Sequence, residues 1–126
     1  MGIARELSPE GIWRIRLTGT VTSQDSISNL LEIPEVHREN TLYSIVVYSD
    51  DVILPKSANA RKNTRIALKR ILKDYRKVIV AFVANADLNY GHVRQICSEV
   101  ETDRIDMEVF RAEADAFAWV KQLMAE

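Results

Sequence analysis

The hydrophobic and polar positions of this chain alternate with strand and helix periods after an opening hairpin. Two alternating runs flank the sequence SPEG at residues 8–11, which places Pro at the second turn position and Gly where positive φ is tolerated. If the first strand ends by pairing Ser8 with Ile12, an apolar pair and an opposite-charge pair face each other across the hairpin. Those pairs are Leu7 with Trp13 and Glu6 with Arg14.

Beyond the hairpin the pattern predicts strands that are each followed by a helix. Strands are expected near 12–18, 43–49, 77–84 and 106–111, with an edge strand near 3–8. Helices are expected near Ser23 or Asp25, over the basic stretch 56–77, from Asp87 to about Glu101, and from the last strand to the C-terminus.

Residues 45–47 and 78–84 are apolar at consecutive positions, which a strand needs only when both of its faces are covered. Because helices separate the later strands, we expect those strands to be parallel, with right-handed crossovers. The sequence therefore predicts one α/β domain over residues 1–126. It has a mostly parallel five-stranded sheet, an antiparallel N-terminal edge strand and four helices.

Positive charge is concentrated in one segment. Residues 56–77 hold nine of the seventeen Lys and Arg residues, whereas the formal net charge of the whole chain is −1. At 100° per residue this helix has an apolar face and a basic face. The apolar face holds Ala67, Leu68, Ile71, Leu72 and Tyr75, and the basic face holds Lys62, Arg65, Lys69, Lys73 and Arg76.

Three interpretations of the basic face remain open: a solvated surface, a patch for a partner protein or a membrane surface, and a nucleic-acid site. A chain that binds polyanions in general is usually basic overall, and this one is not. We expect no measurable binding to random duplex DNA at physiological salt.

A candidate ligand or anion site comprises Asp50, Ser57, Arg61 and Arg65. Arg61 falls in the apolar sector one turn from the helix start, close to the sheet edge where open α/β sheets bind ligands. Ser57 stands at the expected N-cap, where it is either an ordinary cap, part of a phosphate site with the two arginines, or itself phosphorylated. Asp50 ends a central strand, a position that α/β enzymes use for catalytic acids.

Other chemistry is absent from the sequence pattern. The single cysteine, Cys97, shares a helix face with Val93, Ile96 and Val100 and is interpreted as a core residue. Two histidines without ligand spacing and four scattered glycines predict neither a metal site nor a phosphate loop. We therefore expect no enzyme activity, no cofactor and no metal, the alternative being a hydrolase that uses Asp50 or Ser57.

The chain also lacks a secretory signal and a membrane-spanning run, which together with the lone cysteine predicts a cytoplasmic protein.

Three segments, GIWRIRLTGTVT, KVIVAFVAN and MEVFRAEADAFAWV, together with the order of elements, resemble the bacterial SpoIIAA-like proteins. These are grouped with STAS and CRAL-TRIO lipid-binding domains. The resemblance implies a SpoIIAA-like (STAS-like) fold and a small non-enzymatic module, often a dimer, that binds a protein partner or a small apolar ligand. The phosphorylated Asp-Ser-Ser-Gly motif of anti-sigma-factor antagonists is replaced here by PKSANARKN, which contains Ser57.

The resulting expectation is a non-enzymatic regulatory or binding module of the STAS-like type. A homodimer is expected because the resemblance puts most helices on one side of a sheet that is apolar on both faces. Alternatively, a small lipid-like ligand covers the second face of the sheet, and its acid group interacts with Arg61. A nucleic-acid-associated protein that uses residues 56–77 is a further alternative.

Overall fold

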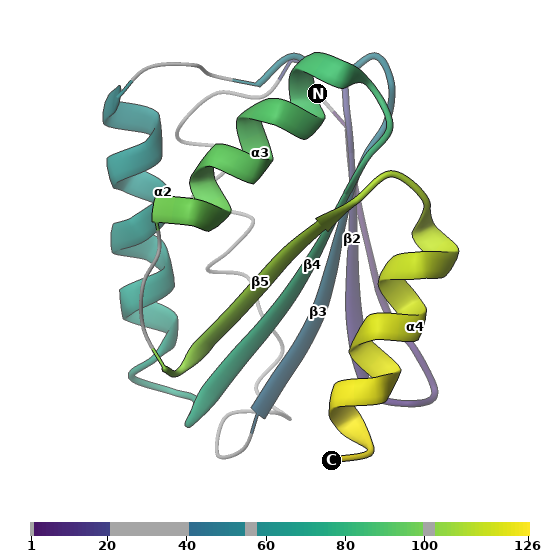
Figure 1. Cartoon of the computed structure of the whole chain (residues 1–126), viewed down its shortest axis with the longest axis vertical. Helices are drawn as coiled ribbons and strands as arrows, with labels where there is room; N and C mark the ends of the chain where they lie inside the picture. Colours follow the sequence, from purple (N-terminus) through teal and green to yellow (C-terminus); the bar gives the residue numbers. More distant parts are fainter. Residues whose placement is uncertain (1, 21–40, 55–57, 100–102) are drawn as a thin grey trace.

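The computed structural model describes residues 2–20, 41–54, 58–99 and 103–126 (Figure 1). In these residues the strands are β1 (Gly2–Leu7), β2 (Ile12–Thr18), β3 (Thr41–Tyr48), β4 (Lys77–Ala84) and β5 (Ile105–Phe110). The helices described are α2 (Ala58–Ile71), α3 (Asp87–Glu99) and α4 (Glu113–Met124). The predicted α/β class and five strands are confirmed, but three helices are described instead of four. The helix predicted near Ser23 or Asp25 lies outside the described residues.

The N-terminal hairpin has the register that its turn predicts. The backbone N–H of Ser8 donates to the carbonyl of Ile12 at 2.9 Å, and the Ile12 N–H donates to Ser8 Oγ at 3.0 Å. Gly11 adopts φ 93°, a left-handed conformation that favours glycine. The two cross-strand pairs are confirmed, with Leu7 opposite Trp13 and Glu6 opposite Arg14.

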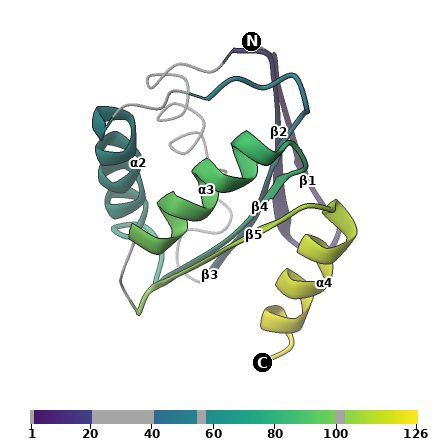
Figure 2. The same ribbon diagram turned by 45° about the horizontal axis from the view of Figure 1, so that its top comes forward.

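The five strands lie in the sheet in the order of the sequence, β1-β2-β3-β4-β5. The first pair is antiparallel and the other three pairs are parallel, as predicted. Right-handed crossovers between parallel strands that follow one another across a sheet put their helices on the same face. Accordingly α2 and α3 lie on one face of the sheet, whereas α4, which follows β5, lies on the other (Figure 2).

The face under α2 and α3 holds the larger core cluster. Alternate side chains of β3 and β4 meet the buried faces of the two helices, including Leu42, Val46, Val80 and Phe82 from the strands and Leu68, Ile71 and Val93 from the helices. The angular prediction for α2 is confirmed, since Ala67, Leu68, Ile71 and Tyr75 are buried and Leu72 is half-buried.

The opposite face is covered by α4. Its buried Ala116 and Val120 pack with the other alternate side chains of the strands, among them Ile12, Ile45, Val47, Ile79, Ala81 and Val83, all at most 7% exposed. The dimer was predicted on the assumption that the chain leaves the second face of the sheet uncovered. That assumption is wrong, because α4 covers this face within one chain. The dimer itself stays a prediction.

The basic helix is shorter than its charge run, because α2 ends at Ile71. Carbonyl groups beyond this end accept hydrogen bonds from the Arg104 guanidinium. Nη2 donates to Leu72 O at 2.6 Å and to Tyr75 O at 2.7 Å, and Nε donates to Arg76 O at 2.9 Å. A cation at a helix C-terminus also interacts favourably with the helix dipole. No helix in the described part of the chain combines the length and the apolar content that a membrane crossing requires.

Val120→Ala tests the packing of α4 on the second face. Val120 is fully buried, so removing two methyl groups should lower the free energy of unfolding by about 2 kcal/mol through lost burial and the cavity left behind. Urea unfolding followed by circular dichroism measures the change. Gln122→Ala on the exposed side of α4 is the control and should stay within about 0.5 kcal/mol. Equal effects from both substitutions would contradict the packing described.

Candidate functional site

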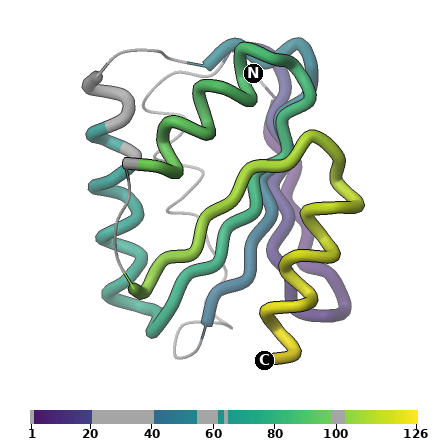
Figure 3. Tube along the Cα trace, in the orientation of Figure 1, coloured from purple at the N-terminus to yellow at the C-terminus, as the bar shows by residue number. Residues whose placement is uncertain are grey.

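The departure of α3 and α4 to opposite faces creates a topological switch point between β4 and β5. The two strands are adjacent and parallel, and their traces lie side by side (Figure 3). After β4 the chain turns to the face of α3, and after β5 it turns to the face of α4. Open α/β sheets bind ligands in the crevice where the chain diverges in this way, at the carboxyl ends of the strands.

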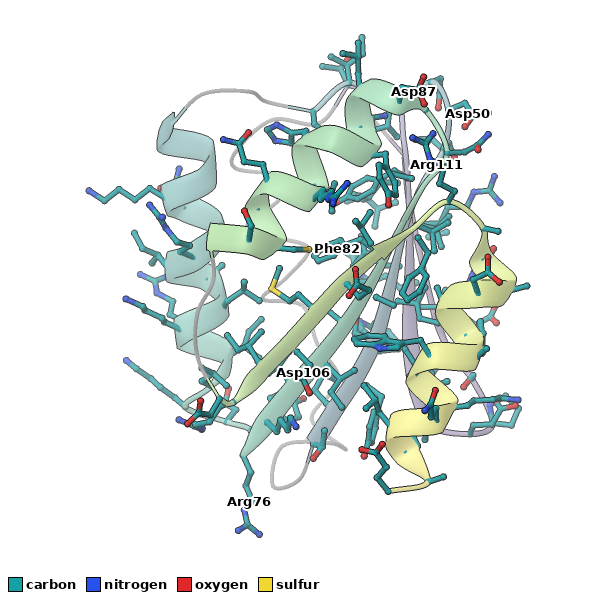
Figure 4. The ribbon with its side chains drawn as sticks, in the orientation of Figure 1. Asp50, Arg76, Phe82, Asp87, Asp106 and Arg111 are labelled. Carbon is teal, nitrogen blue, oxygen red and sulfur yellow. The ribbon has the colours of Figure 1, made fainter. Side chains whose placement is uncertain are left out.

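Arg111 lies at this point, directly after β5. Its Nη1 donates to the carbonyl of Asn85 at 2.9 Å and to Asp87 Oδ1 at 2.5 Å, so it joins the end of β5 to the start of α3. Figure 4 shows Asp50, Asp87 and Arg111 at the same end of the sheet. The Arg111 side chain is 48% exposed and that of Asp87 is 91% exposed, so water reaches both groups.

The guanidinium of Arg111 also stacks on Tyr90, with its carbon 4.2 Å from the ring centroid. Tyr90 packs against the larger core cluster and gives the arginine a fixed support. Both hydrogen bonds of Arg111 use Nη1, so in the described residues Nε and Nη2 keep donors without a hydrogen-bond partner. These donors form the planar fork that suits a carboxylate or a phosphate.

The neighbouring loop after β3 is held against α3 by a buried amide. Asn89, 6% exposed, donates from Nδ2 to the carbonyl of Val52 at 2.8 Å. This bond brings the segment after β3 next to the first turn of α3, where Ile53 is 60% exposed and Leu88 is 72% exposed. The edge therefore presents apolar side chains beside the charged groups of the switch point.

The candidate residues predicted from sequence are only partly described. Asp50 is exposed in the turn after β3, and it makes no hydrogen bond or ion pair in the described residues. Arg65 is exposed on α2. Ser57 lies outside the described residues, as does the side chain of Arg61, so the predicted grouping of these four residues stays a prediction.

Two sequence interpretations concern reactive groups. Cys97 packs against the larger core cluster, as predicted, and burial raises the pKa of its thiol to about 12, with the charge of Glu108 adding to the effect. A thiol with this pKa is protonated at neutral pH and is a poor nucleophile. Among the described residues, no three His, Cys, Asp or Glu side chains are grouped so that they could hold a metal ion.

The start of α4, which places this helix on the second face, is fixed by an ion pair. Arg14 of β2 donates from Nε to Glu113 Oε1 and from Nη2 to Glu113 Oε2, the latter at 3.1 Å. The hydrogen bonds from Arg14, followed by its positive charge, lower the pKa of the Glu113 carboxyl below its ordinary value, although partial burial opposes the shift. Ala112, the N-cap residue, makes no side-chain hydrogen bond, so Arg14 and Glu113 provide the polar anchor here.

Sequence reasoning missed Arg111, Asp87 and Tyr90. A polar residue immediately after a parallel strand is a usable signal, and Asn85 and Arg111 both occupy such positions. Their association depends on β4 and β5 being neighbours, because Arg111 and Asp87 are 24 residues apart. The local pattern of apolar and polar residues does not determine which strands are neighbours in the sheet.

Compared with known protein families, curated proteins and solved structures, the chain matches no family model, no curated protein and no solved structure. The SpoIIAA-like resemblance therefore stays a proposal.

Glu113→Gln tests the ion pair that anchors α4. Because the folded pKa of Glu113 is lowered, its contribution to stability is fully present above its ordinary pKa of 4.5 and is lost as the pH falls through the lowered value. The substitution should cost no more than about 1 kcal/mol near neutral pH, since Glu113 is 38% exposed and water screens the pair.

Below the folded pKa the variant and the parent protein should have equal stability, as measured by urea unfolding over a pH series. Gln122→Ala, on an exposed residue of the same helix that carries no titratable group, is the control and should change stability by the same small amount at every pH. A Glu113→Gln difference that is the same at neutral and acidic pH would contradict this account of the pair.

Proposed function

We propose that this protein is a non-enzymatic binding module that binds an anionic group at the switch point between β4 and β5. The ligand chemistry is a carboxylate or a phosphate, carried by a small molecule or by a side chain of a partner protein. The observation that carries the proposal is the fixed guanidinium of Arg111, stacked on Tyr90 and tethered to Asn85 O.

Preorganisation is the physical reason for choosing Arg111. An arginine that must be ordered on binding loses side-chain entropy, which offsets part of its interaction with an anion. Here the stacking and the tether have already ordered the side chain. The Nε and Nη2 donors that remain can then make two parallel hydrogen bonds to one anionic group.

Asp87 supports the same interpretation, because a carboxylate of the chain already interacts with Nη1 of Arg111. Asp87 bonds to Nη1 and leaves Nε and Nη2 available, so a ligand need not displace it. Its negative charge repels a second anion on the same guanidinium, an effect that water screens because the Asp87 side chain is 91% exposed.

The apolar side chains next to the switch point indicate that the ligand carries an apolar chain beside its anionic group. Leu88 follows Asp87 in the first turn of α3, and Ile53 is held close by the bond between Asn89 and Val52. A ligand with an acid head and a short apolar chain would bury part of these two side chains. Such burial contributes about 25 cal/mol per Å² of apolar surface removed from water.

A SpoIIAA-like architecture remains part of the proposal. Its support is the order of elements that the sequence predicts and the three resembling segments. The hydrolase alternative is weaker, because Asp50 is exposed and has no hydrogen-bonded nucleophile or base beside it in the described residues.

Titration with inorganic phosphate, acetate and hexanoate, followed by nuclear magnetic resonance of backbone and arginine side-chain N–H groups, tests the proposal. We expect shifts confined to residues 52–54, 85–90 and 110–113 and to the Arg111 side chain, with Kd in the millimolar range, about −4 kcal/mol. Hexanoate should bind more tightly than acetate because its chain contacts Leu88 and Ile53.

Arg111→Lys should weaken phosphate binding by about fivefold or more, since lysine cannot form the bidentate fork. Asp87→Asn should strengthen phosphate binding, since it removes a negative charge that repels the anion. Arg94→Ala, on an exposed arginine elsewhere on α3, is the matched control and should leave binding unchanged. Equal losses from Arg94→Ala and Arg111→Lys, or no shift at the switch point, would refute the proposal.

A further inference from the structure

The outer face of α2 is a continuous basic surface. Its exposed cations are Lys62, Arg65, Lys69 and Arg70, and past the end of the helix the exposed Lys73 and Arg76 flank one exposed acid, Asp74. In Figure 4 side chains extend away from the molecule along this side of α2, and Arg76 points outward below it. One apolar residue, Ile66, interrupts the charges and is 42% exposed.

This charge pattern does not serve the stability of the helix. The first turn of α2 carries no acid to interact with the helix dipole. Arg65 and Lys69 stand four residues apart, a spacing at which like charges repel by a few tenths of a kcal/mol. In the described part of the chain, Lys62, Lys69, Arg70, Lys73 and Arg76 make no ion pair through their side chains.

A helix face that only keeps a protein soluble usually carries both signs of charge, with acids and bases interspersed. The outer face of α2 instead concentrates one sign, while the chain as a whole has a net charge of −1. This selective placement favours an anionic partner over simple solvation.

The other residues of α2 indicate which kind of anionic molecule binds this surface. The apolar face of α2 is buried against the sheet through Leu68 and Ile71, so it cannot insert into a bilayer as the apolar face of an interfacial helix does. The exposed residues of α2 include no aromatic ring on which a nucleotide base could stack. A single aliphatic side chain ringed by Lys62, Lys69 and Arg70 matches instead the anchor-and-rim pattern of a protein contact.

We propose that the outer face of α2 docks an acidic amphipathic helix of a partner protein. Ile66 would pack against the apolar row of that helix, and the surrounding cations would pair with its acidic rows. Lys62 to Arg70 spans about 12 Å at 1.5 Å per residue, which corresponds to about two turns of the docked helix. The inference does not depend on the switch-point site, because it uses none of its residues.

The test uses the full chain and a labelled synthetic helical peptide of about fifteen residues, with glutamates at i, i+4 spacing beside one row of leucines. Fluorescence anisotropy at about 50 mM salt should show saturable binding. Lys69→Glu with Lys73→Glu should weaken it by about tenfold or more, and Ile66→Ala by about threefold. All three altered residues are exposed, and circular dichroism of each variant verifies that it is folded.

Arg94→Glu reverses an exposed charge on α3 and should leave peptide binding unchanged. A peptide of the same composition with dispersed leucines should bind about fivefold more weakly, because it presents no apolar row to Ile66. The inference is overturned if the dispersed peptide binds equally well, if Arg94→Glu weakens binding as much as the α2 reversal, or if no peptide binds. Tighter binding to random duplex DNA or to vesicles of phosphatidylserine and phosphatidylcholine overturns it as well.

Discussion

The central strands β3 and β4 carry apolar side chains on both faces, and the need to keep water from both faces governs the rest of the fold. Crossovers of the same hand between neighbouring parallel strands place α2 and α3 on one face. Helix α4, which follows β5, covers the second face through Ala116 and Val120. The bond between Arg14 and Glu113 fixes where this helix begins.

The candidate site is a consequence of the same constraint. Because α3 and α4 leave neighbouring strands toward opposite faces, the chain diverges at the carboxyl ends of β4 and β5. Arg111 crosses this point and bonds to Asn85 and Asp87. A fold with every helix on one face would not have this divergence of the chain beside Arg111. The proposed binding function thus depends on where the last helix packs.

Much of this fold could be predicted because its signals are local. The SPEG turn specifies the hairpin register, and the angular positions of Leu68, Ile71 and Lys69 separate the buried and exposed faces of α2. The side of the sheet that α4 covers was missed, although the apolar runs of β3 and β4 required a cover. The switch point was missed as well, because it depends on contacts between residues far apart in the sequence. Asp50 could be placed at the correct edge, but its local pattern does not identify Arg111 two strands away.

Hydrogen exchange of the backbone amides of β3 and β4, measured by mass spectrometry over a wide range of protein concentrations, tests the central claim most directly. If α4 covers the second face within one chain, the protection of these amides will not change on dilution, since no partner is needed to keep the strands dry. Protection that falls steadily as the protein is diluted would contradict the account, because it would mean that a second subunit provides the cover.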